Sequence, residues 1–264
     1  MTAPLRPAHA LRPARSLTAV TLIGIAALAS TAGLGALGVW QVKRLGWKLD
    51  LIARVERRLA AEPAPAPDRT AWDTLTAASA EYLKVHVTGR FRHERETLVL
   101  AVTDLGRGSW VLTPLDTTQG FTVLVNRGFV PPERRDPATR AAAAIAGETT
   151  VTGLLRLTEP GGAFLRANDP TQDRWYARDV AAIASARGLA DAAPYFIDAD
   201  ATPNPGGWPA GGLTQVSFSN NHRVYALTWF GLALMTLAGG LYVVWDWRRE
   251  QANGLARHGE TAGS

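Results

Sequence analysis

The fold is decided first by residues 17–39, which read LTAVTLIGIAALASTAGLGALGV and include no charged side chain. As an α-helix this run extends about 34 Å, enough to cross a hydrocarbon core of about 30 Å. A second uncharged run, VYALTWFGLALMTLAGGLYVVW, covers residues 224–245. Helices in soluble protein cores rarely stay uncharged for so long. The sequence therefore predicts two transmembrane helices, one towards each end of the chain.

Small residues recur along one side of each predicted helix. They are Ala29 and Gly33 in the first run, and Gly231 and Gly239 in the second. Small residues let membrane helices approach closely. We therefore expect the two helices to pack against each other at these positions.

Both ends of the chain are predicted to lie in the cytoplasm. The first run exceeds the apolar core of a usual signal peptide and no clean Ala-x-Ala site follows, so we expect it to remain as an anchor. Only Arg223 precedes the second run closely, whereas basic residues follow it, as is typical of a cytoplasmic flank. The predicted segments are a cytoplasmic basic tail at 1–16, the first transmembrane helix at 17–39, a helical extension and Pro-rich linker at 40–68, an extracytoplasmic domain at 69–223, the second transmembrane helix at 224–245, and a cytoplasmic tail at 246–264 that is expected to be unstructured after Arg249.

The composition excludes several classes of function. Lys and Arg total 28 against 23 for Asp and Glu, a net charge of +5. Much of this excess lies near the apolar runs and no basic recognition helix is visible, so nucleic acid is not an expected partner. The chain has no Cys, which excludes disulfides, thiolate nucleophiles and Cys-based metal sites.

No catalytic constellation is visible from the spacing of residues. A phosphate loop, a Gly-x-Ser-x-Gly motif and a His-Glu-x-x-His motif are all lacking from the sequence. Gly33-x-Gly35-x-x-Gly38 matches the dinucleotide fingerprint. That motif requires a preceding strand, whereas here it lies inside the first predicted membrane helix. We therefore predict that the chain is not an enzyme.

Between the apolar runs the pattern changes to short strands. Helical spacing continues to about residue 59, and three prolines within 62–68 end it. Apolar and polar residues alternate over 82–91, which is typical of a half-buried strand. One helix is predicted at 179–187, with Asp179 as its cap. Further strands are predicted at 97–103, 110–115, 121–125, 151–157, 195–198 and 215–218. The sequence therefore predicts a membrane protein whose β-rich domain is a β barrel or is sandwich-like, with minor α content.

Two stretches at the membrane boundaries, 38–48 and 220–230, hold the most informative polar residues. The predicted orientation brings both to the outer interface, where they offer an imidazole, several cations and aromatic rings. A neutral His can ligate haem iron, and cations can pair with haem propionates. The same residue types also anchor ordinary membrane helices at the interface, and spacing alone favours that interpretation.

Several short motifs occur in a fixed order along the chain. Trp40, Gln41 and Arg44 form Trp-Gln-x-x-Arg, and residues 125–131 form Val-Asn-Arg-Gly-aromatic-Val-Pro. Residues 220–230 form Asn-x-His-x-x-Tyr-Ala-x-Thr-Trp-Phe. Smaller elements lie at Val87, Gly89 and Phe91, at 113–115, at 168–169 and at 176–179. In this order, and between two terminal apolar runs, the motifs resemble the Surfeit-locus family of cytochrome c oxidase assembly factors. Phe129 stands where that family often carries Trp.

The resemblance implies a role in building a respiratory haem–copper oxidase. Family members are associated with haem a and with its placement in the large oxidase subunit. We therefore expect a chaperone of the bacterial plasma (inner) membrane, with a periplasmic domain, that binds haem a transiently and helps its insertion. The expected partners are the large haem-bearing subunit, the haem a biosynthesis enzyme and membrane lipid. The alternative is a scaffold that stabilises an oxidase assembly intermediate without binding a cofactor.

The resemblance also indicates which residues meet the cofactor. The family His at the start of the second span corresponds to His222, which is the expected ligand of the haem iron. The other expected cofactor-binding residues are Arg223, Arg44, Lys43, Arg127, Trp229 and Tyr225.

For some polar residues the sequence pattern favours a structural role over a functional one. Arg127 is expected to hydrogen-bond turn carbonyls or to pair with a carboxylate. His86 and His93 are expected to be solvated strand or turn residues. The acidic residues Asp169, Asp173 and Asp179 are expected to serve in turns and helix caps rather than in an acidic site.

Overall fold

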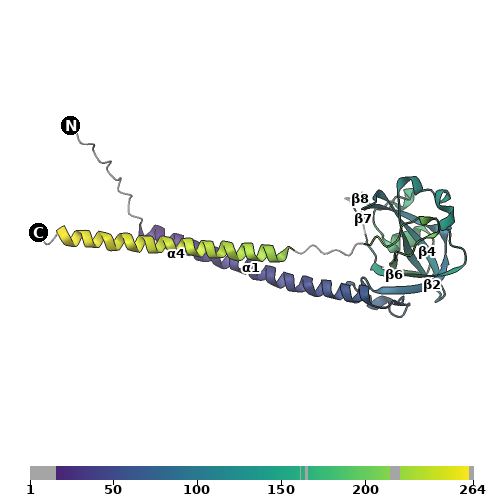
Figure 1. Cartoon of the computed structure of the whole chain (residues 1–264), viewed down its shortest axis with the longest axis horizontal. Helices are drawn as coiled ribbons and strands as arrows, with labels where there is room; N and C mark the ends of the chain where they lie inside the picture. The colour runs from purple at the N-terminus through teal and green to yellow at the C-terminus, as the bar shows by residue number, and fades with distance from the viewer. Residues whose placement is uncertain (1–15, 161, 164–165, 215–220, 262–264) are drawn as a thin grey trace, which may run out of the picture. The chain divides into compact units, whose positions relative to one another are not determined.

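The computed structural model describes residues 16–160, 162–163, 166–214 and 221–261, and two long helices dominate its ends (Figure 1). They are α1 (Leu17–Ala60) and α4 (His222–Thr261). Over Leu17–Ala60 and His222–Asn253 they are long and apolar enough to cross a membrane. The chain forms two compact units, Met1–Leu51 with Phe218–Ser264, and Ile52–Ser217.

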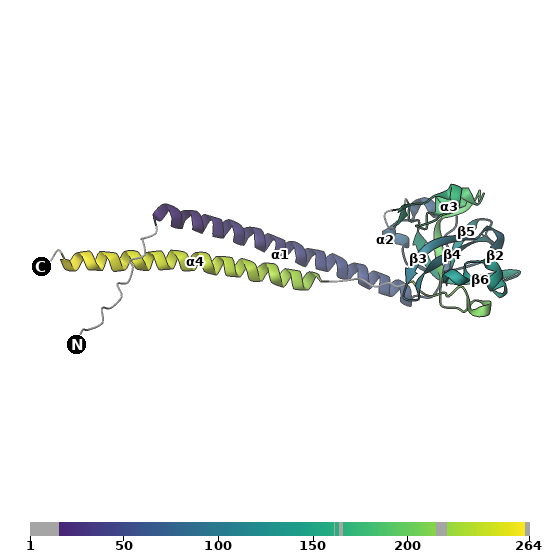
Figure 2. The same ribbon diagram turned by 90° about the horizontal axis from the view of Figure 1, so that it is seen from above.

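Within the first unit the two long helices lie side by side and antiparallel (Figures 1 and 2). They lie close together at two glycines. A Cβ on Gly38 would lie 2.6 Å from the ring of Phe230, and one on Gly240 would lie 2.7 Å from the Cβ of Ala27. The small residues named from the sequence do not make this contact, so that prediction was wrong: a Cβ added at Gly33, Gly231 or Gly239 would meet no atom of the partner helix within 4 Å, and Ala29 is exposed. Small residues can be counted in a sequence, but which of them face the partner helix depends on the crossing geometry.

The end of α4 differs from the sequence prediction. The tail after Arg249 was expected to be unstructured, yet the helix continues to Thr261. Glu250, Gln251 and Ala252 have high helix propensity and no proline follows, so nothing in the sequence stops the helix where the membrane run ends.

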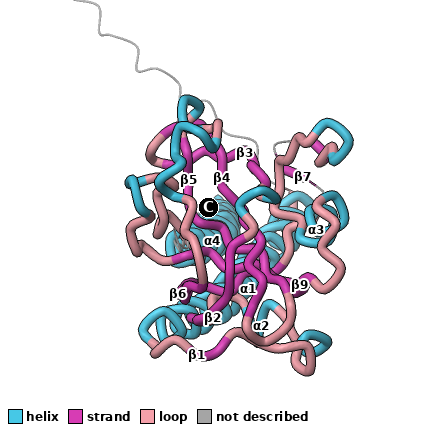
Figure 3. The backbone as a smooth tube through the Cα atoms, turned by 90° about the vertical axis from the view of Figure 1, so that its right-hand side faces the viewer, coloured by secondary structure: helices cyan, strands magenta, loops and turns pink. Residues whose placement is uncertain are grey.

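Five strands of the second unit close into a barrel (Figure 3). The five are β2 (Lys84–Phe91), β4 (Gly106–Thr117), β5 (Thr122–Val130), β6 (Glu148–Leu157) and β9 (Ala192–Ala199). They pair in the order β2–β6–β9–β5–β4, and β4 returns to β2 where Gly89 faces Thr117. All of these pairs are antiparallel except β5–β9, which is parallel. The β-rich prediction is confirmed, and the barrel is the correct one of its two alternatives.

Shorter elements extend and cover the barrel. Strand β3 (Thr97–Thr103) pairs with β4 at the predicted bounds, and β1 (Ala64–Pro65) pairs with β2. The helix predicted at 179–187 is α3 (Val180–Ala186), capped by Asp179 as expected. The strand predicted at 215–218 lies outside the described residues. The remaining elements are α2 (Ala77–Ala80), β7 (Gly162–Ala163), β8 (Arg166–Ala167), and the 3-10 turns η1 (Trp72–Thr74), η2 (His93–Arg95), η3 (Pro132–Arg134), η4 (Pro137–Ala143), η5 (Pro170–Gln172) and η6 (Pro205–Gly207).

Strand β5 is longer than predicted. The predicted strand ended at Val125, but β5 continues through Arg127 and Gly128 to Val130. Gly128 has φ +127°, and a Cβ there would lie 2.1 Å from the carbonyl oxygen of Ala210. The backbones of Phe129 and Ala210 exchange two hydrogen bonds of 2.9 Å. Glycine therefore permits an irregular strand and a close crossing chain rather than a turn.

Two apolar layers hold the barrel. The interior contains Val125, Leu155 and Ile197, none of which is exposed. The outer face of β5 and β9 is covered by α3, whose Ile183 packs in one buried cluster with Phe196. Burying each such side chain contributes about 1.5–3 kcal/mol. Because alternate residues of a strand share one face, Arg127 lies on the same face of β5 as Val123 and Val125, which is the face towards the barrel interior.

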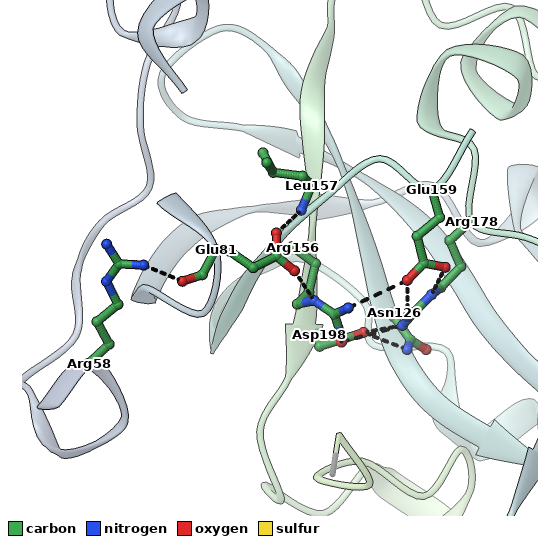
Figure 4. Close-up of polar contacts among 8 residues, drawn as sticks. All are labelled: Arg58, Glu81, Asn126, Arg156, Leu157, Glu159, Arg178 and Asp198. Atoms are coloured by element: carbon green, nitrogen blue, oxygen red, sulfur yellow. Dashed lines mark hydrogen bonds and ion pairs between the residues drawn. The ribbon is translucent and has the colours of Figure 1, made fainter. Parts of the chain in front are cut away.

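A buried ionic network joins the barrel strands (Figure 4). Asp198 on β9 accepts hydrogen bonds from Arg156 Nη1 at 3.1 Å and Arg178 Nη1 at 3.0 Å. Asn126 Nδ2 donates to the same carboxylate at 2.7 Å. The side chain of Asp198 is 1% exposed. One buried anion therefore holds two arginines that lie far apart in the sequence.

The network extends to the end of α1. Glu81 accepts from Arg156 Nε at 2.6 Å and from the Leu157 amide at 3.0 Å, and its backbone carbonyl accepts from Arg58 Nη1 at 2.6 Å. Burial lowers the pKa of the Arg156 guanidinium, but Asp198 and Glu81 outweigh burial and raise the pKa overall. The last turn of α1 is thereby fixed to the polar network of β6.

Candidate functional site

The first candidate site lies between α1 and α4 within the helical unit. His222 is the first residue of α4, and its Nδ1 lies 2.7 Å from the amide oxygen of Gln41. Gln41 is buried and His222 is partly buried. Because an amide oxygen can only accept a hydrogen bond, Nδ1 is the donor in this contact, and in the neutral imidazole Nε2 then keeps its lone pair. The imidazole is therefore oriented as a metal-ligating His usually is, with its second nitrogen held by a hydrogen bond.

The other predicted site residues of the helical unit belong to the same two boundary stretches as this contact. Lys43, Arg44, Arg223 and Tyr225 are exposed, and Trp229 is partly buried. The guanidinium carbon of Arg44 lies 4.3 Å from the centroid of the Trp47 ring. The two boundary stretches thus contact each other through Gln41 and His222, and their place at the outer membrane interface stays a prediction. We call the group formed by Gln41, Lys43, Arg44, His222, Arg223, Tyr225 and Trp229 the helix junction.

The chemistry of the helix junction fits a haem. A neutral imidazole with a free nitrogen is an axial ligand, exposed cations can pair with propionates, and aromatic side chains suit a macrocycle beside lipid. The sequence supplied all of these residues, but it gave Gln41 no role. The contact joins residues that are 181 positions apart, so no local pattern could reveal it.

Arg127 belongs to the barrel unit and is 2% exposed. Its Nη2 donates to the carbonyl oxygen of Ala143 at 2.6 Å and to the side-chain oxygen of Asn204 at 2.8 Å. The guanidinium carbon lies 5.0 Å from the centroid of the Phe91 ring. Hydrogen bonding to a loop carbonyl agrees with the structural prediction. Burial lowers the pKa of Arg127, and although Glu96 partly offsets this effect, the pKa falls to about 10.

His93 is a partner of Arg127 and not the solvated residue that was predicted. It is partly buried, its Nε2 donates to the carbonyl oxygen of Ile145 at 3.1 Å, and its Nδ1 lies 3.3 Å from Arg127 Nη1. His86 is also partly buried, with Nδ1 3.2 Å from the carbonyl oxygen of Pro63. Burial and the neighbouring Arg127 cation lower the pKa of His93. Alternation along a strand could not show this, because the covering loop comes from a distant segment.

We expect His93→Gln to flatten the acid sensitivity of the barrel. In the native chain the folded His93 has a pKa below 6.5. The unfolded chain therefore takes up the proton first, and stability falls as the pH drops from about 6.5 through the folded pKa. Urea unfolding of the native chain and the variant between pH 7.5 and 5 checks this. An equal fall of both midpoints would contradict it, and His86→Gln serves as the control.

The acidic residues behave as predicted. Asp169 accepts from the Gln172 amide at 3.2 Å and Asp179 from the Ala182 amide at 3.1 Å, so both cap helical turns. Asp173 ends η5 in a left-handed conformation. Within the described residues no three His, Asp or Glu side chains gather as a metal site.

The fold and the helix junction together define a class of protein: a small β barrel carried between two helices that are long and apolar enough to cross a membrane. A sequence model of the SURF1 family matches residues 28–234, which include the helix junction and the barrel. The chain belongs to the SURF1 family, and the resemblance found in its motifs is confirmed.

Several relatives share this similarity. Surfeit locus protein 1 of Mus musculus is 41% identical over 216 residues, covering 76% of this chain and 68% of the relative. Surfeit locus protein 1 of Homo sapiens is 39% identical over 217 residues, covering 76% and 70%. A SURF1-like protein of Monosiga brevicollis is 40% identical over 216 residues, covering 76% and 80%.

Proposed function

We propose that this chain assists the assembly of a respiratory haem–copper oxidase by binding haem a at the helix junction and helping its insertion into the large subunit. Membership of the SURF1 family supports the role in oxidase assembly. The observation that carries the cofactor proposal is the hydrogen bond between Gln41 and His222 Nδ1. It leaves Nε2 available to iron, which is the arrangement that axial ligation requires.

Each residue of the helix junction has a separate task in this proposal. Haem a, when bound, supplies an iron that accepts an axial nitrogen ligand. Gln41 holds the ring and the tautomer of His222. The exposed cations Lys43, Arg44 and Arg223 pair with the propionates, and Tyr225 and Trp229 contact the apolar ring. Arg127 is left out of this set, since its cavity of about 130 Å³ is below the volume of usual cofactor pockets, about 300–1,000 Å³.

The membrane topology is part of the same proposal. Both long helices span the bacterial plasma membrane, and the termini lie in the cytoplasm, because basic residues follow the second apolar run. The barrel then lies on the periplasmic side. Binding is transient, since a carrier must release its haem to the large subunit. The chain acts as a chaperone and does not turn over a substrate.

A scaffold without cofactor is the second candidate function. Trp40 and Trp47 on α1 are 56% and 52% exposed, so the helix offers large apolar side chains to a partner. Exposed aromatic residues of this size are common anchors in protein interfaces. Such a helix could hold an assembly intermediate of the oxidase through contacts alone.

The two functions predict different effects of His222→Ala. The variant is expressed in a strain that lacks its own SURF1 relative, and haem a is measured per large subunit in the membranes. The carrier proposal expects a loss of about tenfold or more, and a comparable loss for Gln41→Leu, since the residues that orient a metal ligand contribute about 10–100-fold to affinity. Native assembly by His222→Ala, with a loss in Trp40→Ala and Trp47→Ala, would contradict the carrier proposal and favour the scaffold.

A further inference from the structure

A cavity of about 130 Å³ opens at one end of the barrel, independently of the helix junction. Its wall includes Phe91, Val125 and Val151 from three barrel strands, and Thr202 and Asn204 from the loop after β9. Barrel mouths are common binding sites for small molecules. The volume accommodates a ligand of a few heavy atoms.

Arg127 also lines this cavity and brings a buried charge to it. Among the described residues no carboxylate oxygen lies within 4.0 Å of its guanidinium. The nearby Glu96 is already paired with Arg140. Arg127 Nε is buried and has no hydrogen-bond partner in the described part of the chain. A buried cation that no carboxylate contacts is costly, and this cost favours the binding of an anion beside it.

The polar groups around Arg127 hold it in place without neutralising it. Ala143 O, Asn204 Oδ1 and His93 Nδ1 accept its hydrogen bonds, and all three are uncharged groups. Asn204 is itself fixed, because its Nδ2 donates to the carbonyl oxygens of Arg127 at 3.1 Å and Pro209 at 2.7 Å. The guanidinium is thus positioned before any ligand arrives, as in preorganised anion sites.

We propose that this cavity binds a small monovalent carboxylate whose charge is balanced by Arg127. Asp200 lines the same cavity and is partly exposed, with its carboxylate accepting from the Thr202 amide at 2.9 Å. A second negative charge in the cavity opposes ions of charge −2, so phosphate binds less well than a monocarboxylate. The carboxylate comes from a free metabolite-sized acid or from an acidic side chain of a protein partner.

The test measures thermal unfolding of the full-length chain in detergent with sodium acetate, propionate or phosphate against chloride at equal ionic strength. Propionate is expected to raise the unfolding midpoint saturably by about 3 °C at tenfold excess over half-saturation. Arg127→Gln removes this shift. Asp200→Asn lowers the half-saturating propionate concentration about fivefold and allows phosphate to stabilise the barrel. Asp191 is exposed and lies outside the cavity, so Asp191→Asn should change neither the half-saturating propionate concentration nor the response to phosphate.

Other variants keep the proposal falsifiable if Arg127→Gln does not fold. Ala199→Leu fills part of the cavity and retains Arg127, so it should abolish the propionate shift. A shift that is linear in salt and equal in all variants would overturn the proposal, as would an unchanged response of Asp200→Asn. A peptide with one Glu is compared with its Gln counterpart in the same unfolding assay of the native chain. A shift with the Glu peptide indicates that the carboxylate comes from a protein partner, whereas a shift with acetate or propionate indicates a free acid.

Discussion

Asp198→Leu is expected to lower the free energy of unfolding of the barrel by about 3–5 kcal/mol. The side chains of Arg156 and Arg178 are only 14% and 13% exposed, and both are paired with Asp198. Removing this carboxylate leaves two poorly solvated cations close together, with Glu81 and Glu159 as their remaining anions. Leucine supplies volume but no acceptor for Asn126. Guanidinium unfolding followed by tryptophan fluorescence measures the loss.

The control is an exposed pair of the same chemistry. Arg174 is 55% exposed and pairs with Asp169 at 2.8 Å, so Arg174→Gln should leave the unfolding midpoint almost unchanged, because solvent screens an exposed ion pair. If Asp198→Leu destabilised the barrel no more than this control, the buried ionic network would not contribute to the stability of the barrel.

Gly128→Ala is expected to destabilise the barrel by about 3 kcal/mol or more. Two effects add at this position. The backbone has φ +127°, which is unfavourable for an L side chain, and the new Cβ would lie 2.1 Å from the Ala210 carbonyl oxygen. The loop that carries Ala210 must then move away from β5, and its two backbone hydrogen bonds to Phe129 are lost. Urea unfolding and the near-ultraviolet circular dichroism of the barrel report both changes.

Gly106→Ala separates the two effects. Gly106 has φ +99°, but a Cβ added there would have no described atom within 4 Å. Only the backbone strain remains, which costs about 1–2 kcal/mol. Equal losses in the two variants would mean that the close approach of Ala210 contributes nothing.

The elements that could be predicted from the sequence are those with a strong local pattern. The uncharged runs predicted both long helices, the alternation over 82–91 predicted β2, and the shorter strand signals predicted β3, β4, β6 and β9. Strand β5 was cut short, because Arg127-Gly128 has the composition of a turn while its conformation depends on the distant Ala210. Strand β1 is two residues long and includes Pro65, too little for any periodicity.

The candidate sites could be predicted only in part, because they depend on contacts between residues that lie far apart in the sequence. His222 and the flanking cations were predicted through a family resemblance, whereas its partner Gln41 was only one letter of a motif until the helices were paired. Arg127 was predicted as a residue of interest, but its place in a barrel mouth depends on closure between β2 and β4. The ionic network around Asp198 was not predicted at all, since its members are drawn from β6, β9 and a loop.

The most direct test is the absorption spectrum of the full-length chain, purified in detergent after co-production with haem a synthesis. We predict a haem a spectrum for the native chain and for His86→Ala, which removes another partly buried histidine. The same spectrum should be lost in His222→Ala. A native chain without haem, or a His222→Ala variant that retains it in full, would contradict the proposal that His222 and Gln41 form a haem site.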